Sequence, residues 1–258
     1  MPLNPLEEAR RILHEAEFRG VTLRLLGGTA VLMRCPSAGS GRLTRARAPD
    51  IDLAGFKKEN SAIKAVFEAV GYEPNEHFNA LHGYKQLMFY APDGEPKVDV
   101  FLDQFEMCHR LDLRPRLGLS KETLPLADLL FTKLQIVEIN EKDIKDIVAL
   151  FLDHDVVQGE QAHTIDGGFL AQLSAEDWGV YTTFIDNLRK VQEGLGELGL
   201  DRGSTKAVAD RIGRLRGWMD EIPKSLGWRL RAKVGRRMAW YELPDEPKAI
   251  VLGPGRRS

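Results

Sequence analysis

One short segment constrains the fold of this chain more than any other feature: polar and apolar residues alternate along 50–54 (DIDLA). Alternation with a period of two is typical of a β-strand that is buried on one face. Residues i and i+2 of a strand share a face, so Asp50 and Asp52 project together while Ile51 and Leu53 point into a core. Neighbouring carboxylates repel each other unless a cation lies between them, and their hard oxygens suit Mg²⁺ or Mn²⁺.

A third carboxylate is expected beside the first two. Segments 86–90 and 97–102 have the pattern of a β-hairpin. In the second of these strands Val98 and Val100 face the core, so Asp99 faces the same outer surface as the other carboxylates. If the two carboxylate-bearing strands are adjacent, three carboxylates converge, which is enough for a two-metal site.

A glycine-rich turn, Gly27-Gly28-Thr29, lies between a predicted strand (21–26) and a predicted short helix (29–33). Glycine lets the backbone approach a ligand closely, and a helix N-terminus offers free N–H groups to phosphate oxygens. Thr29 adds a hydroxyl donor. The order of strand, glycine turn, helix, loop and Asp-x-Asp strand predicts a phosphate-binding turn beside the metal site.

This ordered combination resembles the signature of the DNA polymerase beta-type nucleotidyltransferase superfamily. Within it, the chain is most similar to the AbiEii-like nucleotidyltransferases, the toxins of type IV toxin–antitoxin systems. Members of that group carry a Gly-Gly-Thr-Ala turn, an Arg shortly before Asp-Ile-Asp-Leu, a later helix with a Lys, and a helix with Arg/Lys-Asp-x-x-Asp. The matching segments here are 27–30, 50–53, 128–135 (DLLFTKLQ) and 142–146 (KDIKD), and the loop before Asp50 contains Arg42, Arg45 and Arg47.

The resemblance covers about residues 20–152 and implies an α+β protein with a minimal nucleotidyltransferase fold, a mixed sheet flanked by helices. It implies that Asp50 and Asp52 bind metal, that Gly28 and Thr29 hold the triphosphate, and that Lys133 contacts nucleotide phosphate. Asp143 or Asp146 completes the site, and the residues leave that choice open. The chain departs from the family in its long 35–49 loop and in Lys142-Asp143 where the family has Arg-Asp. The predicted catalytic residues are Asp50, Asp52, Asp99, Lys133, Asp143 and Asp146, the first three as metal ligands, and the predicted nucleotide-binding residues are Gly27, Gly28, Thr29 and Arg47.

The activity that the resemblance implies is transfer of a nucleoside monophosphate from an NTP, such as ATP, to an acceptor hydroxyl with release of pyrophosphate. The acceptor expected from the family is the 3′ end of tRNA, and the toxin is expected to have a cognate antitoxin. Two alternatives stay open. One keeps the chemistry with a small-molecule acceptor such as an aminoglycoside, which predicts an acidic pocket; the other is a non-catalytic nucleotide-binding or antitoxin-like module.

The chain divides in the sequence into a nucleotidyltransferase core (1–155) and a mainly helical C-terminal domain (156–258). The core ends with two segments that are apolar at helical spacing, 124–139 and 142–152. Beyond about residue 160 the pattern is helical throughout, except for short strands expected near the end. The expected C-terminal elements are helices near 173–196 and 203–222 and strands near 238–243 and 249–252.

A basic stretch over 202–237 holds eleven Lys and Arg but only three acids, together with Trp218 and Trp228. Basic residues interleaved with aromatic ones predict binding to an RNA backbone. The alternative is a solvated helix face with its tryptophans in the core.

Composition excludes several classes. The formal net charge is −2, so global charge points to no partner. Cys35 and Cys108 lie far apart without a CxxC motif, which excludes a zinc framework and gives little reason to expect a disulfide. The N-terminus has no signal-peptide pattern, and no apolar run approaches the ~20 residues that span a bilayer. We therefore predict a cytoplasmic protein without a membrane partner.

Overall fold

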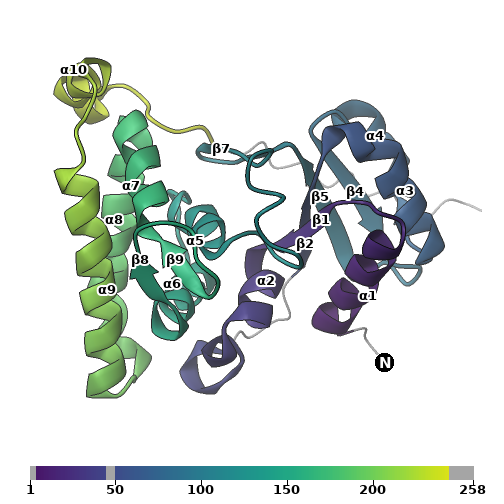
Figure 1. Cartoon of the computed structure of the whole chain (residues 1–258), viewed down its shortest axis with the longest axis horizontal. Helices are drawn as coiled ribbons and strands as arrows, with labels where there is room; N and C mark the ends of the chain where they lie inside the picture. Colours follow the sequence, from purple (N-terminus) through teal and green to yellow (C-terminus); the bar gives the residue numbers. More distant parts are fainter. Residues whose placement is uncertain (1–3, 45–49, 244–258) are drawn as a thin grey trace, which may run out of the picture.

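The computed structural model describes residues 4–44 and 50–243, and a five-stranded mixed sheet lies at the centre of its N-terminal half (Figure 1). The strand order is β1-β2-β5-β4-β3, with β2 and β5 parallel and the other neighbours antiparallel. The predicted α+β class, with a mixed sheet flanked by helices and a mainly helical C-terminal part, is confirmed. The strands are β1 (Leu23–Leu26), β2 (Ile51–Gly55), β3 (Glu73–Pro74), β4 (Gln86–Tyr90) and β5 (Lys97–Leu102).

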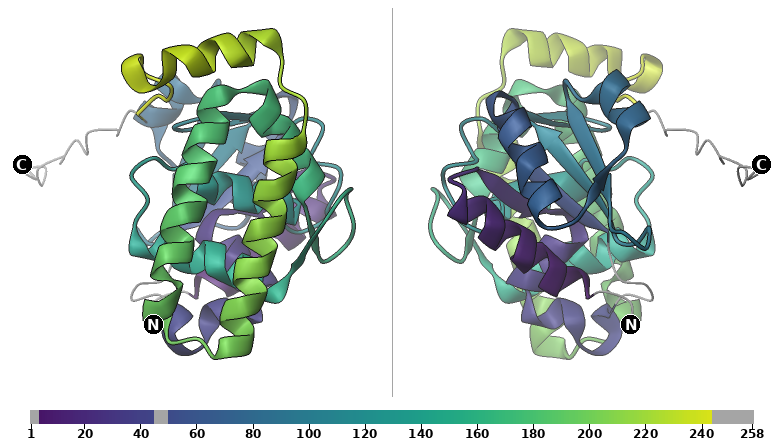
Figure 2. Two further views of the ribbon diagram at one scale, coloured as in Figure 1. Left: turned by 90° about the vertical axis from the view of Figure 1, so that its left-hand side faces the viewer. Right: turned by 90° about the vertical axis from the view of Figure 1, so that its right-hand side faces the viewer.

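One face of the sheet is covered by α1 (Pro5–Phe18) and α3 (Asn60–Ala69), as the right-hand view of Figure 2 shows. Phe67 of α3 stacks on Phe89 of β4, with ring centroids 3.9 Å apart, and both rings are buried. Because successive side chains of a strand alternate between faces, this packing leaves the neighbours of the buried residues on the opposite face. That opposite face carries the carboxylates.

The helix after β1 begins earlier than the sequence predicts. α2 spans Gly27–Arg34 and so includes both glycines of the turn. It is followed by two 3-10 turns, η1 (Pro36–Gly39) and η2 (Gly41–Leu43), where an irregular loop was expected. Residues 45–49 lie outside the described residues, and with them the predicted nucleotide contact of Arg47.

Several short elements were not predicted. They are α4 (Glu76–His82), the hairpin of β6 (Gln104–Glu106) and β7 (Arg110–Asp112), and the parallel pair of β8 (Asp155–Val157) and β9 (Thr164–Asp166). The strand β9 contradicts the expectation that the chain is helical throughout beyond residue 160. Strands of three residues carry too little periodicity to be seen locally, and they form here because packing buries Phe105, Leu111 and Ile165.

The helical half contains α5 (Leu126–Leu134), α6 (Glu141–Asp153), α7 (Gly167–Glu176), α8 (Trp178–Gly194), a 3-10 turn η4 (Leu195–Leu198), α9 (Arg202–Glu221), α10 (Leu226–Val234) and a 3-10 turn η5 (Gly235–Arg237). The single helix predicted over 173–196 is split at Asp177, whose Oδ1 caps α8 by accepting from the N–H of Gly179 at 2.6 Å. The strand predicted over 238–243 is wrong, since that segment is irregular in the structure. The one predicted over 249–252 lies outside the described residues.

Helices α5 and α6 contact both halves of the molecule. They pack on α2, which follows the first sheet strand, and on α7, α8 and α9. α8 and α9 lie side by side in the left-hand view of Figure 2. The buried apolar residues form one cluster that extends from Ala9 to Met219. The division of the chain at 155/156 stays a prediction.

Most of the basic stretch 202–237 stabilises the helical half itself. Arg211, for example, donates to the carbonyl oxygens of Phe151 at 2.6 Å and Leu152 at 2.9 Å. Trp228 donates its Nε1–H to the carbonyl oxygen of Ser174. Seven of the eleven basic side chains contact groups of this chain: Lys206, Arg211, Arg214, Arg216, Lys224, Arg231 and Arg236. The other four, Arg202, Arg229, Lys233 and Arg237, have no polar partner among the described residues. The part of the chain that the structure describes contains no helix with the length and apolarity to span a bilayer.

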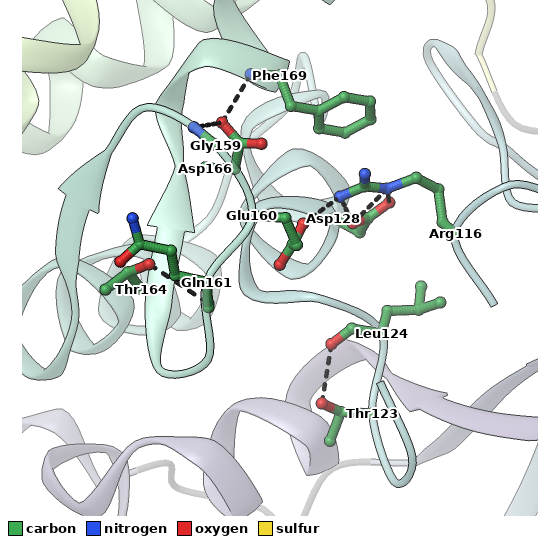
Figure 3. Close-up of polar contacts among 10 residues, drawn as sticks. All are labelled: Arg116, Thr123, Leu124, Asp128, Gly159, Glu160, Gln161, Thr164, Asp166 and Phe169. Carbon is green, nitrogen blue, oxygen red and sulfur yellow. Dashed lines mark hydrogen bonds and ion pairs between the residues drawn. The ribbon is translucent and has the colours of Figure 1, made fainter. Parts of the chain in front are cut away.

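A buried ion network joins the loop after β7 to α5 and to the loop before β9 (Figure 3). Arg116 donates to Asp128 at 2.7 to 3.0 Å and to Glu160 at 2.8 Å, and its guanidinium lies 3.9 Å from the ring centroid of Phe169. Asp128 is fully buried. Burial raises the pKa of Asp128 to about 6, although Arg116 opposes that rise.

We expect Arg116→Met to lower the free energy of unfolding at pH 7 by about 3 to 5 kcal/mol, because it leaves the Asp128 carboxylate buried without a counter-ion. The loss should shrink toward pH 5, since a protonated Asp128 needs no cation. Urea denaturation at both pH values measures it. The control is Arg114→Met, which breaks an exposed pair with Asp112 and should leave the free energy of unfolding nearly unchanged. Equal free energies of unfolding for the two variants would contradict the prediction.

Candidate active site

The sheet brings two of the predicted carboxylates together. Asp52 of β2 and Asp99 of β5 are Cα partners in the parallel register, so the condition that their strands be adjacent is met. Asp99 is buried, whereas Asp50 is exposed and lies one residue before β2. The Thr29 hydroxyl donates to the Asp50 carbonyl oxygen at 2.8 Å and so ties the glycine turn to the start of β2.

Asp52 lies in an environment that disfavours its negative charge. Its pKa is raised to about 7, first by burial and then by the charges of Asp99 and Asp50. The positive charges of Lys133 and Lys97 lower the pKa of Asp52, but they do not cancel this rise. A divalent cation relieves this kind of repulsion.

Asp99 is held by two side chains that sequence reasoning missed. Lys97 Nζ lies 2.6 Å from Asp99 Oδ2, and Gln86 donates its Nε2–H to Asp99 Oδ1 at 2.9 Å. Burial disfavours the charge of Lys97, but Asp99 and the other two carboxylates outweigh this and raise the pKa of Lys97. The signal for Lys97 was present in the sequence, because a residue two positions before Asp99 on a strand shares its face.

A second buried cluster involves the residues predicted on α5 and α6. Lys133 Nζ lies 3.0 Å from Asp143 Oδ1 and 2.9 Å from Asp146 Oδ2, and all three side chains are buried. Both carboxylates therefore hold the lysine, where the sequence left the choice between them open. The Lys133 charge also acts on Asp52, since it lowers the pKa of that carboxyl. A contact from Lys133 to nucleotide phosphate stays a prediction.

The first glycine of the turn has a steric role at this site. Gly27 has φ +67°, and a Cβ there would lie 2.2 Å from Asp52 Oδ2. Only glycine lets the Asp52 carboxylate lie this close to the backbone. The residue at the N-cap position of α2 is Leu26, whose apolar side chain cannot accept a hydrogen bond. The N–H groups of the first turn are therefore not capped by that side chain. Thr29 uses its hydroxyl on Asp50, so a contact of Gly28 and Thr29 with triphosphate stays a prediction.

We expect Gly27→Ala to reduce nucleotide transfer at least tenfold, because the new methyl group displaces the Asp52 carboxylate. Gly20→Ala is the matched control: Gly20 has φ +69°, but a Cβ there meets nothing within 4 Å. Both variants should lose about 1 kcal/mol or more of stability through the left-handed backbone. Steady-state kinetics and thermal unfolding separate the two effects. A Gly20→Ala enzyme as impaired as Gly27→Ala would show that backbone strain alone is responsible.

The residues fit a divalent metal by their chemistry. Among the described residues, no three His, Cys, Asp or Glu side chains form a ready-made ion site. Both oxygens of Asp99 already accept from protein donors. Hard carboxylate oxygens that repel each other are nonetheless the ligands that Mg²⁺ and Mn²⁺ prefer. Metal binding through Asp99 would therefore compete with the Lys97 ammonium for that carboxylate.

A cavity of about 720 Å³ lies between the β6–β7 hairpin, the α7–α8 junction and α10. None of the predicted site residues that the structure describes lines it. Trp178, Trp228 and Trp240 form part of its walls. Its carboxylates outnumber its two arginines, Arg110 and Arg231; the carboxylates are Glu106, Glu176, Asp177 and Glu242.

Comparison with known proteins does not assign this chain to a family. No protein-family model matches the sequence, and no curated protein matches it. Among solved structures, the chain is similar to the solution structure of the antibiotic-resistance factor ANT(2'')-Ia, with 16% sequence identity. The match covers 58% of this chain and 84% of that chain, with a TM-score of 0.37. Because so slight a likeness fixes neither fold nor function, both depend on the residues of this chain.

Proposed function

We propose that this protein is a metal-dependent nucleotidyltransferase, which moves a nucleoside monophosphate from an NTP to an acceptor hydroxyl. The observation that carries this proposal is the pairing of Asp52 with Asp99 in the β2–β5 register, with the Asp52 carboxylate directly against Gly27. A phosphate-binding turn and a carboxylate pair in contact are what this reaction needs, because its catalysis consists mainly of positioning and charge stabilisation.

Each part of the site has a proposed task. Asp50, Asp52 and Asp99 would hold Mg²⁺ or Mn²⁺, which when bound neutralises the triphosphate and lowers the pKa of the acceptor hydroxyl. The backbone of Gly27 and Gly28 and the first turn of α2 would bind triphosphate oxygens. Lys133, held by Asp143 and Asp146, would add positive charge to the same region. The acceptor oxygen bonds to the α-phosphorus, its proton passes to solvent, and the bond to the leaving pyrophosphate breaks.

The acceptor that we propose first is the 3′ end of tRNA, with the protein acting as a toxin that has a cognate antitoxin. The support on the chain is modest, namely the four basic side chains on α9, α10 and η5 that have no polar partner among the described residues. A small molecule with several amino groups is the second candidate. The 720 Å³ cavity has the excess of carboxylates that a cationic ligand needs, although none of the described site residues lines it.

The test is incubation of the purified protein with each α-labelled NTP, Mg²⁺ or Mn²⁺, and either tRNA or a set of aminoglycosides. Label on tRNA supports the first acceptor and label on an aminoglycoside supports the second. Nucleotide binding without transfer to any acceptor, including total RNA and the protein itself, would favour the non-catalytic module. Complete absence of both binding and transfer would overturn the proposed function.

A further inference from the structure

We propose that Lys97 is a built-in counter-ion of the Asp52–Asp99 pair, and that a divalent ion must displace its ammonium from Asp99 in order to bind. Lys97 would then set the metal affinity of the site without being a ligand itself. This inference rests on the proposed function and names a residue that would control metal binding at its site.

The position of Lys97 on β5 makes the contact possible. It precedes Asp99 by two residues and so lies on the same face of the sheet. The ion pair of 2.6 Å is as short as charge-assisted contacts become. Gln86 on the neighbouring strand β4 occupies the second oxygen. Each oxygen of the Asp99 carboxylate therefore has a protein partner without a metal.

Displacement of Lys97 is feasible because its ammonium can reach water. The Lys97 side chain is 32% exposed, whereas that of Asp99 is 8% exposed. A lysine can keep its alkyl stem on the sheet while its head moves into solvent. Asp99 has no such freedom, so the lysine is the mobile partner of the pair.

The Lys97 ammonium cannot remain in contact with Asp99 when a metal binds. An ion that takes Asp99 Oδ2 as a ligand would lie against the Lys97 ammonium, and two positive charges in contact repel each other. Without a metal, Asp99 is neutralised by Lys97, whereas Asp52 has no ion pair of its own among the described residues. The negative charge that lacks a counter-ion is therefore that of Asp52. Removal of the Lys97 charge should therefore tighten metal binding roughly tenfold.

The experiment measures Mn²⁺ binding to the full metal-free chain at pH 8 without nucleotide, using the paramagnetic resonance signal of free Mn²⁺. We expect the Kd of Lys97→Met to fall about tenfold and that of Lys97→Arg, which keeps the charge, to match the wild type. Lys64→Met is the matched control. It makes the same change in net charge at an exposed position of α3, which covers the opposite face of the sheet.

Unchanged or weaker Mn²⁺ binding by Lys97→Met would overturn the inference, because Lys97 would then only support Asp99. An equal gain in Lys64→Met would overturn it too, since net charge would explain the effect. If Lys97→Met does not fold, as judged by circular dichroism, Lys97→Gln decides, because it keeps a hydrogen-bond donor without the charge. A wild-type protein that binds Mn²⁺ and transfers nucleotide, with no gain in the variants, would sink this inference alone. A wild type and variants that neither bind Mn²⁺ nor transfer nucleotide would remove the proposed function as well.

Discussion

Asp52→Asn should reduce nucleotide transfer by a factor on the order of 10³ or more, with little change in the fold. The substitution keeps the shape of the side chain but removes the charge that pairs with Asp99 in the register of β2 and β5. Losses of this size follow when one preorganised charged group is removed from a site of charge development. Asp93→Asn, in the exposed turn between β4 and β5, is the control and should retain full activity.

The same variant should be more stable than the wild type when metal is absent. The folded pKa of Asp52 is about 7, well above the ~3.9 of an unfolded aspartate. The folded state therefore binds the proton more tightly, and its stability falls as the pH rises from about 4 through about 7. At pH 8 we expect Asp52→Asn to gain roughly 1 to 3 kcal/mol, since each pKa unit is worth ~1.4 kcal/mol and solvent screens part of the effect.

Urea denaturation in EDTA at pH 5 and pH 8 measures this gain. The gain should be clearly smaller at pH 5, where Asp52 is still protonated in the folded state, than at pH 8. Mg²⁺ with an NTP should then stabilise the wild type and not the variant, because only a protein that binds the ligand is stabilised by it. A variant that is less stable at pH 8, or equally active, would contradict the role assigned to Asp52.

The second large effect is a loss of stability, which we expect when Lys133 is replaced. Lys133→Met leaves Asp143 and Asp146 buried without the ammonium that lies 3.0 and 2.9 Å from them. Breaking a buried ion pair by removing one partner costs about 3 to 5 kcal/mol. Lys206→Met, which removes an exposed i,i+4 pair on α9, should change stability by much less.

A charge-free version of the Lys133 cluster separates stability from activity. Lys133→Met combined with Asp143→Asn and Asp146→Asn buries no charge and should recover much of the lost stability. It should not recover nucleotide transfer, because the positive charge that acts on Asp52 is still missing. Equilibrium unfolding and the transfer assay, run on the same samples, measure both. Recovery of transfer in the triple variant would show that Lys133 only stabilises the fold.

Much of the N-terminal fold was predictable because its signals are local. The alternation over 50–54 specified a strand, and the two segments that pair as β4 and β5 carried a hairpin pattern. The elements that were missed, such as β6, β7 and β9, have three residues each and no pattern of their own.

The basic stretch shows the limit of composition as a guide. Eleven positive charges over 202–237 predicted an RNA-binding face, yet Arg211 and Arg214 donate to backbone carbonyls of the segment 151–156. A guanidinium serves equally well to satisfy the end of a helix and to bind a phosphate. Only the neighbours in space distinguish these uses.

The sequence by itself determined that Asp52 lies on a strand that follows a glycine turn, with Asp50 directly before that strand, because strand periodicity depends only on near neighbours. The tertiary structure decided that β5 lies parallel to β2, which sets Asp99 beside Asp52 and brings Lys97 and Gln86 with it. It also decided that Lys133 is held by Asp143 and Asp146 together. These contacts join segments that are distant in the chain, and their pairing is selected by the burial of the whole core rather than by any local pattern.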